Sequence, residues 1–107
     1  MLKIINYLEK KKKEMDYGIN KNGKEIYPFI NYSVFDEKIN INYGFSNNDE
    51  NDINVLLIEK KDDNIELITK NDGFSIMHGV YKTKSIKNFN SEEDIYKHIK
   101  SEINSYY

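Results

Sequence analysis

Two histidines are the side chains best suited to acid–base chemistry near neutral pH in this chain of 107 residues. His78 falls on the same side of its expected strand as Phe74, Ile76 and Val80. A histidine on an apolar face can serve a pocket as an acid or a base, but more often its nitrogens bond to backbone or water within a core. We favour the core interpretation for His78.

The second histidine, His98, follows Asp94 by four residues and precedes Glu102 by four. On a helix this spacing gives ordinary surface pairs, each worth a few tenths of a kcal/mol. We therefore interpret His98 as part of a solvated helix face.

Metal and cofactor motifs are missing from the sequence. The chain has no cysteine, which excludes disulfides, thiolate metal ligands and a cysteine nucleophile. Residues 47–52 are rich in oxygen ligands, but they lack the ligand spacing, the glycine and the final glutamate of an EF-hand loop. Glycine-rich phosphate loops and the G-x-S-x-G serine motif do not occur either. The sequence therefore predicts no metal, no cofactor and no enzymatic activity.

Acidic residues gather in the segments that we expect to connect strands. In an up-and-down meander, the loop 46–52 and the turn at residue 72 lie at the same end of the sheet, and that loop has no lysine. An acidic patch can steer toward a basic protein surface and dock on it, and tyrosine is enriched at interfaces. The alternative is that turns favour aspartate and asparagine for conformational reasons alone. The predicted partner-binding residues are Asp49, Glu50, Asp52, Asp72 and Tyr81.

Charge and hydropathy argue against nucleic acid and membranes as partners. The chain has a formal net charge of −2, and all of its 16 basic residues are lysines. Residues 10–13 are four consecutive lysines, which we place at the C-terminal end of a helix, where cations complement the dipole. The longest aliphatic run, residues 55–58, is too short to span a membrane, and the first residues lack the apolar stretch of a signal peptide. We expect a cytoplasmic protein.

The elements that must position these residues are a helix, a run of strands and a second helix. Periodicity predicts helices over residues 2–15 and after Ser91, where the Ser-x-x-Asp pattern is typical of a capped helix start. Asn22-Gly23 predicts a tight hairpin, and Pro28 favours an edge position or a bulge. Helices that flank a run of strands indicate an α+β fold. We predict one domain over residues 1–107, with an N-terminal helix, an antiparallel meander of five or six strands, and a C-terminal helix packed on the sheet. The strands are expected at residues 17–20, 24–35, 39–45, 53–60, 65–70 and 74–85.

Two of the predicted strands are apolar on both faces. Residues 26–30 and 55–58 are continuous apolar runs, a pattern typical of strands that are buried on both sides. Either the two helices cover opposite faces of the sheet, or a partner or a second copy covers one face. We favour the arrangement in which the helices cover opposite faces.

Together these observations favour a small non-enzymatic module that binds or inhibits a protein partner with a basic surface. Isoleucine, lysine and asparagine make up 47 of the 107 residues, a bias typical of AT-rich genomes. The size and bias would suit a phage or mobile-element protein that blocks a host defence nuclease. Two alternatives stay open. One is a self-assembling structural subunit, such as a homodimer, and the other is a ligand-binding domain or enzyme that uses His78 with Glu59 or Glu66.

Overall fold

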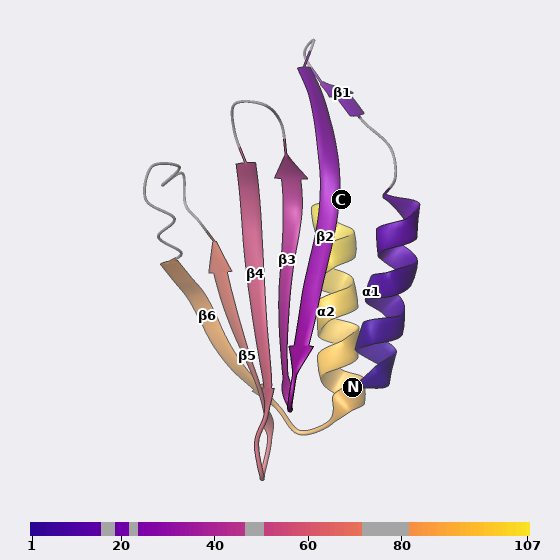
Figure 1. The fold of residues 1–107 in the computed structure, drawn as a ribbon. Helices are drawn as coiled ribbons and strands as arrows, with labels where there is room; N and C mark the ends of the chain where they lie inside the picture. Colours follow the sequence, from indigo (N-terminus) through magenta and orange to yellow (C-terminus); the bar gives the residue numbers. More distant parts are fainter. Residues whose placement is uncertain (16–18, 22–23, 47–50, 72–81) are drawn as a thin grey trace.

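Six antiparallel strands form one sheet, and two helices lie against it (Figure 1). The computed structural model describes residues 1–15, 19–21, 24–46, 51–71 and 82–107, without the side chains at 19–21, 24–25, 51–52 and 82. The predicted α+β fold, with a meander between two helices, is confirmed. In chain order the elements are α1 (Leu2–Glu14), β1 (Ile19–Lys21), β2 (Lys24–Phe35), β3 (Lys38–Ser46), β4 (Asn51–Lys60), β5 (Ile65–Asn71), β6 (Lys82–Phe89) and α2 (Glu92–Tyr106).

The strands pair in sequence order from β1 to β6. The β2–β3 hairpin stays in register up to the pair of Phe35 and Lys38. Asp36, in the turn, has a φ of 53°, a left-handed conformation that aspartate tolerates better than most residues. The predicted edge environment of Pro28 also agrees with the pairing. Pro28 lies opposite Phe45 of β3, whereas the described pairs between β1 and β2 end at Ile26.

Both helices lie on the same face of the sheet (Figure 1). Ile4 and Leu8 of α1 join Ile95 and Ile99 of α2 in one buried core. The prediction that the helices cover opposite faces is therefore wrong. The apolar stripe of α1 is short, and α1 buries it against β2 and α2, so α1 needs no sheet face of its own.

The core lies between the helices and one set of alternating strand positions. Successive side chains of a strand point to opposite faces, so burial of Leu56 and Ile58 against the helices directs Val55 and Leu57 to the other face. Each fully buried aliphatic side chain contributes about 1.5–3 kcal/mol. The sheet contributes these fully buried side chains to the core: Ile30, Ile39, Ile41, Leu56, Ile58 and Leu67.

Tyr107 fastens the end of α2 to the sheet. Its hydroxyl oxygen lies 2.7 Å from the carbonyl oxygen of Phe29 and 2.8 Å from that of Gly44, and it accepts a hydrogen bond from the Gly44 N–H at 2.8 Å. Gly44 has no side chain to block this approach to the backbone. The contact holds the end of the helix layer over the β2–β3 pair.

Candidate protein-binding surfaces

The predicted acidic end of the sheet falls largely outside the described residues. The strand ends that flank it do lie together, because β3 and β5 end where β4 and β6 begin (Figure 1). The predicted partner-binding residues outside the described part of the chain are Asp49, Glu50, Asp72 and Tyr81.

Asp52 is described only through its backbone, and it lies in a strand. It pairs with Phe45 of β3, and the same ladder continues to the pair of Ser46 and Asn51. The prediction that Asp52 belongs to a loop is therefore wrong, because the β3–β4 ladder extends further than the apolar alternation indicates.

Of the two histidines, the structure describes only His98. His78 lies outside the described residues. His98 of α2 has its Nε2 atom 3.2 Å from Oε2 of Glu102, which confirms the predicted i,i+4 pair. Its ring centroid also lies 5.2 Å from that of Phe89. His98 is therefore partly buried against β6 and does not lie on a fully solvated face.

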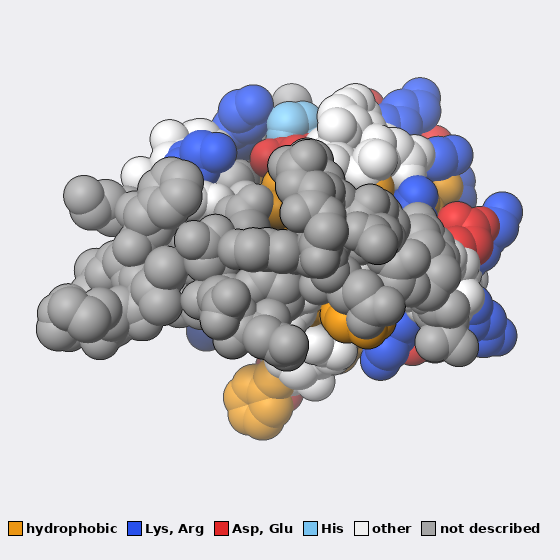
Figure 2. Space-filling model, turned by 90° about the horizontal axis from the view of Figure 1, so that it is seen from above, with side chains coloured by type: hydrophobic (Ala, Val, Ile, Leu, Met, Phe, Trp, Pro, Cys, Tyr) orange, Lys and Arg blue, Asp and Glu red, His pale blue; other side chains and the backbone are white. Residues whose placement is uncertain are grey.

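The sheet face opposite the helices, here called the helix-free face, is apolar at its centre. Val55 and Leu57 of β4 point to this face, Leu57 pairs with Ile68 of β5, and Ile68 pairs with Ile86 of β6. Ile86 is 60% exposed, and Phe35, at the end of β2, is 75% exposed. Figure 2 shows a hydrophobic side chain projecting from the side opposite the helices. An antiparallel sheet with one solvated face normally carries polar residues there, so this face is unusual.

A hollow of about 500 Å³ lies in the helix-free face over β2 to β5. Asparagine amides offer both donors and acceptors, and Lys70 makes no ion pair with a described residue. The hollow thus combines an apolar floor with groups that can bond to a peptide backbone and to an anion. The floor consists of Phe29, Ile53, Val55 and Leu57, and the polar lining consists of Asn31, Asn40, Asn42 and Lys70.

A second hollow, of about 380 Å³, shares Leu57 and Asn40 with the first. Its charged side chains are paired. Lys38 Nζ lies 3.9 Å from Oε1 of Glu59, and Oε2 of Glu66 lies 3.1 Å from the ammonium of Lys61. Lys70 therefore remains the uncompensated charge among the described residues that line the two hollows.

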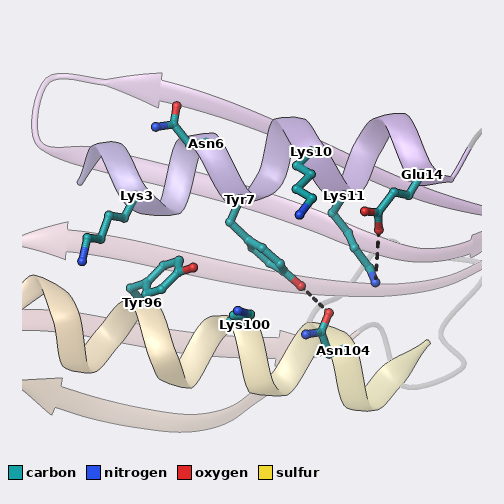
Figure 3. A pocket seen from close by; sticks show the side chains of 9 residues that line it. All are labelled: Lys3, Asn6, Tyr7, Lys10, Lys11, Glu14, Tyr96, Lys100 and Asn104. Atoms are coloured by element: carbon teal, nitrogen blue, oxygen red, sulfur yellow. Dashed lines mark hydrogen bonds and ion pairs between the residues drawn. The ribbon is translucent and has the colours of Figure 1, made fainter.

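A groove of about 620 Å³ runs between α1 and α2 (Figure 3). The helices are parallel, because the Lys3 ammonium lies 2.5 Å from the Glu93 carboxylate near their starts, and the Tyr7 hydroxyl donates to Asn104 Oδ1 at 2.6 Å farther along. The rings of Tyr7 and Tyr96 meet edge to face with their centroids 6.4 Å apart. The charged residues that line the groove are Lys3, Lys10, Lys11, Lys100 and Glu14.

Cations surround the tyrosines of this groove. The ammonium groups of Lys3 and Lys100 each lie 5.9 Å from the ring centroid of Tyr96, within the range of a cation–π interaction. Burial, aided by the nearby Glu14 and Tyr96, raises the pKa of Tyr7 to about 12. The raised pKa extends the pH range in which the Tyr7 hydroxyl is a neutral hydrogen-bond donor into alkaline solution.

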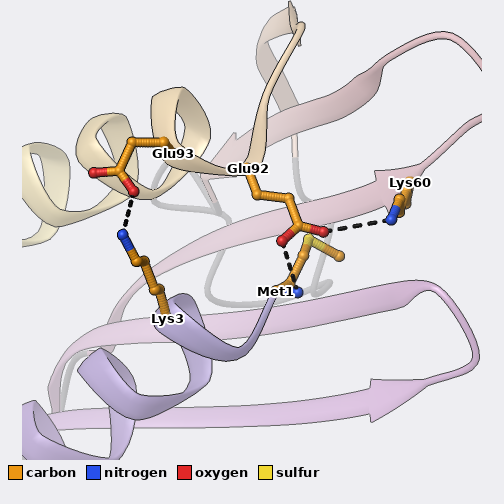
Figure 4. A network of polar contacts seen from close by, with 5 residues as sticks. All are labelled: Met1, Lys3, Lys60, Glu92 and Glu93. Atoms are coloured by element: carbon orange, nitrogen blue, oxygen red, sulfur yellow. Dashed lines mark hydrogen bonds and ion pairs between the residues drawn. The ribbon is translucent and has the colours of Figure 1, made fainter.

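A group of ion pairs joins the starts of both helices to β4 (Figure 4). Oε2 of Glu92 accepts from the amino group of Met1 at 3.2 Å, and Oε1 accepts from Lys60 at 3.4 Å. The hydrogen bond from the Met1 amino group is the largest cause that lowers the pKa of Glu92, and the hydrogen bond from Lys3 does the same for the pKa of Glu93. Both carboxylates are paired within the fold, so we assign this network a structural role.

The described residues contain no group of three or more histidine or acidic side chains that could hold a metal ion. In the same part of the chain, no helix has the length and apolarity needed to cross a membrane. Comparisons with protein-family models, curated proteins and solved structures give no match to this chain.

The sequence predicts neither the groove nor the hollows, although the helical spacing of several groove residues is visible in it. Lys3 and Tyr7 recur at helical spacing on α1, as do Tyr96, Lys100 and Asn104 on α2. These two stripes become one groove only because the helices lie side by side and parallel. Periodicity within one helix does not encode that arrangement.

Proposed function

We propose that this protein is a small non-enzymatic protein-binding module that holds a peptide segment of its partner on the helix-free face. The observation that carries the proposal is the apolar row of Leu57, Ile68 and Ile86 across that face, with Ile86 60% exposed, while both helices pack on the other face. Burial of apolar area is the dominant favourable term in most protein association. Exposed apolar patches rimmed by polar residues mark interaction sites.

The lining of the larger hollow favours a segment with an apolar side chain and a nearby carboxylate. Phe29 and Leu57 would pack against the apolar side chain, and the amides of Asn31 and Asn42 can bond to peptide N–H and C=O groups. Lys70 would pair with the carboxylate. A second copy docked through the same face suits it less well, since it would bring the same uncompensated ammonium, and the described carboxylates that line the two hollows, Glu59 and Glu66, are already paired with lysines.

The β6 edge of the sheet is less suited to binding than the helix-free face. β6 is an edge strand in the strand order and carries Lys84 and Lys87. Lysines on an edge strand discourage pairing with a strand of another chain. This arrangement favours contact through the face, where the apolar side chains are.

The acidic residues predicted at one end of the sheet would add a second contact with the same partner. Asp49, Glu50, Asp52 and Asp72 would meet a basic surface of the same partner, with Tyr81 adding contact area. A module that covers a basic nucleic-acid-binding surface would act as an inhibitor, as expected for a phage or mobile-element protein that blocks a host defence nuclease. The location proposed with this function is cytoplasmic, where a chain without cysteine folds without needing disulfides.

Affinity capture with matched variants tests the proposal. The tagged protein is incubated with a lysate of its natural or host cell, and the purified candidate partner is then titrated by calorimetry. Phe35→Ser with Ile86→Ser removes the most exposed apolar side chains of the helix-free face. Leu2→Ser with Val34→Thr removes exposed apolar side chains elsewhere. We expect the first pair to weaken binding by about tenfold or more, and the second pair to leave it nearly unchanged.

Equal affinity in the two paired variants would place the interface elsewhere and reject the proposal for this face. Sedimentation velocity over a range of protein concentrations tests the self-assembling alternative. A dimer that is lost only in the Phe35 and Ile86 variant would show that a second copy covers the face. A monomer at all concentrations would remove that alternative.

A further inference from the structure

We infer that the groove between α1 and α2 binds an acidic peptide segment, whose carboxylates lie between the ammonium groups of Lys10 and Lys100. This site uses different residues from the helix-free face, because the groove lies between helices that cover the other face of the sheet (Figures 1 and 3). Binding in the groove can therefore be tested separately from binding on the helix-free face.

The groove concentrates positive charge in a chain that is negative overall. Its lining has four lysines and one glutamate, a local formal charge of +3, whereas the whole chain carries −2. Lys3 is paired with Glu93, and Lys11 lies 4.0 Å from Glu14. Among the described residues, the other two lysines have no carboxylate partner.

The two unpaired ammonium groups belong to opposite walls of the groove. Lys10 extends from α1 and Lys100 from α2 (Figure 3). Neighbouring like charges repel, and a carboxylate placed between them converts that repulsion into attraction to both. The groove is therefore arranged for an anion before any ligand arrives.

The helix dipoles explain only part of this charge. Parallel helices bring their C-terminal ends together, and α1 carries Lys11, Lys12 and Lys13 in its last turn, where cations complement the dipole. Lys100 lies in the middle of α2, which ends at Tyr106. The dipole effect falls off within the last turn, so it does not account for Lys100.

The shape of the groove fits an extended peptide. From Lys3 to Glu14 the α1 wall is about 16 Å long at 1.5 Å per residue, the length of about five residues of extended chain. The groove is open along its length, whereas small-ligand pockets enclose roughly 70–90% of their ligand. Tyr7 and Tyr96 offer ring surface for the methylene groups of acidic side chains.

Single-stranded nucleic acid is the other extended polyanion, and the chain suits it less well. Phosphate-binding surfaces are usually strongly basic and rich in arginine. This chain is acidic overall and has no arginine. A phosphate backbone that extends beyond the groove would meet the negative remainder of the chain, whereas a short acidic peptide would lie within the groove.

Fluorescence anisotropy with a labelled hexaglutamate peptide tests the inference on the full chain. The groove variant is Lys10→Gln with Lys100→Gln. The control is Lys13→Gln with Lys97→Gln, which removes the same charge from the same two helices outside the groove. At low salt, about 50 mM, we expect saturable binding that the groove variant weakens by about tenfold and the control by less than about twofold.

Three outcomes would overturn the inference. The first is no saturable binding of hexaglutamate to the unaltered protein up to about 1 mM, an affinity too weak to matter at cellular concentrations. The second is an equal loss of affinity in both variants, which would indicate general charge attraction. The third is tighter binding of a labelled oligothymidylate to the same groove, which would assign it to nucleic acid. Circular dichroism melts of both variants establish that any loss of binding is not a loss of fold.

Discussion

Glu92 is a single residue that connects three separate parts of the fold. Its carboxylate lies 3.2 Å from the Met1 amino group and 3.4 Å from the Lys60 ammonium (Figure 4). Through these contacts the start of α2 is held to the start of α1 and to the end of β4. The side chain is largely solvent-exposed, so screening limits what each pair contributes. Two cations on one carboxylate still make its charge more favourable in the folded than in the unfolded chain.

We expect Glu92→Gln to lower the free energy of unfolding at neutral pH but not in acid. The contacts lower the folded-state pKa of Glu92 below its ordinary value, so their stabilisation is present above the unfolded pKa and is lost as pH falls through the folded pKa. Urea unfolding at neutral pH and at about pH 2.5 measures both limits. Glu37→Gln, in the exposed β2–β3 turn, is the control. A difference from the unaltered protein that persists in acid would contradict this account.

Tyr7 gives the opposite pH dependence at the alkaline end. Its pKa in the folded protein is raised from 10.0 to about 12, chiefly by burial. Its contribution to stability is therefore complete below the unfolded pKa and is lost as pH rises through the folded pKa. We expect Tyr7→Phe to make stability fall less steeply between about pH 10 and 12 than in the unaltered protein. Urea unfolding across this range measures the slope, and an equally shallow slope in Tyr96→Phe would refute the assignment to Tyr7.

At the scale of elements, the start of α2 shows how one residue fixes a helix boundary. The Ser91 hydroxyl accepts a hydrogen bond from the Asp94 N–H at 3.1 Å, as the Ser-x-x-Asp pattern predicts. Three acidic residues in the first turn also complement the helix dipole. The cap satisfies a backbone donor that would otherwise have no partner inside the helix.

Ser91→Ala should lower the free energy of unfolding by about 1 kcal/mol, since alanine cannot accept that bond. Ser101→Ala, at an exposed position within the same helix, should be neutral or slightly stabilising because alanine has the higher helix propensity. Urea denaturation of the two variants measures both effects. A loss equal in the two variants would mean that the cap contributes nothing beyond side-chain size.

Local signals predict most of these elements, because caps, turns and periodicity act within a few residues. The capped start of α2, the alternation of β3 and the position of Pro28 all belong to this class. Strand ends are harder, because pairing with a neighbour decides them. Thus β6 ends at Phe89 opposite Ile65, whereas the sequence predicts an end at Ser85.

The candidate site is less predictable, because it depends on how elements pack. The apolar run around Val55 and Leu57 correctly indicates a strand with two apolar faces, but it does not say which face the helices take. The same limit applies to the groove. Lys10 and Lys100 are 90 positions apart in the chain, and only the parallel packing of α1 on α2 brings them to one groove. Tertiary arrangement, and not any local pattern, creates both surfaces.

At the scale of the whole molecule, charge and apolar surface are separated between layers. The helix layer carries the lysine-rich groove, and the sheet presents its apolar face on the other side (Figures 1 and 2). The strand ends next to the predicted acidic segments lie toward the same end of the molecule as the C-terminal ends of both helices (Figure 1). The proposed function therefore expects a partner that approaches the sheet at this end to meet both the apolar face and the predicted acidic segments.

Neutralising the four acidic side chains of the predicted acidic end should weaken partner binding and reduce the salt dependence of that binding. Substituting Asp49, Asp52 and Asp72 by Asn and Glu50 by Gln removes four negative charges and changes the formal net charge from −2 to +2. Because exposed charges act through long-range attraction that salt screens, the loss should be greatest at low salt. Calorimetric titration with the captured partner at several salt concentrations measures it.

The other end of the sheet supplies the control for that experiment. Neutralising its four acidic residues changes the net charge by the same amount, so a general charge effect would weaken binding equally in both variants. A specific acidic end would leave the control near the unaltered affinity. If the first variant binds as tightly as the unaltered protein at low salt, the acidic end has no part in recognition, and the helix-free face must act without it. The residues altered in the control are Asp36, Glu37, Asp62 and Asp63.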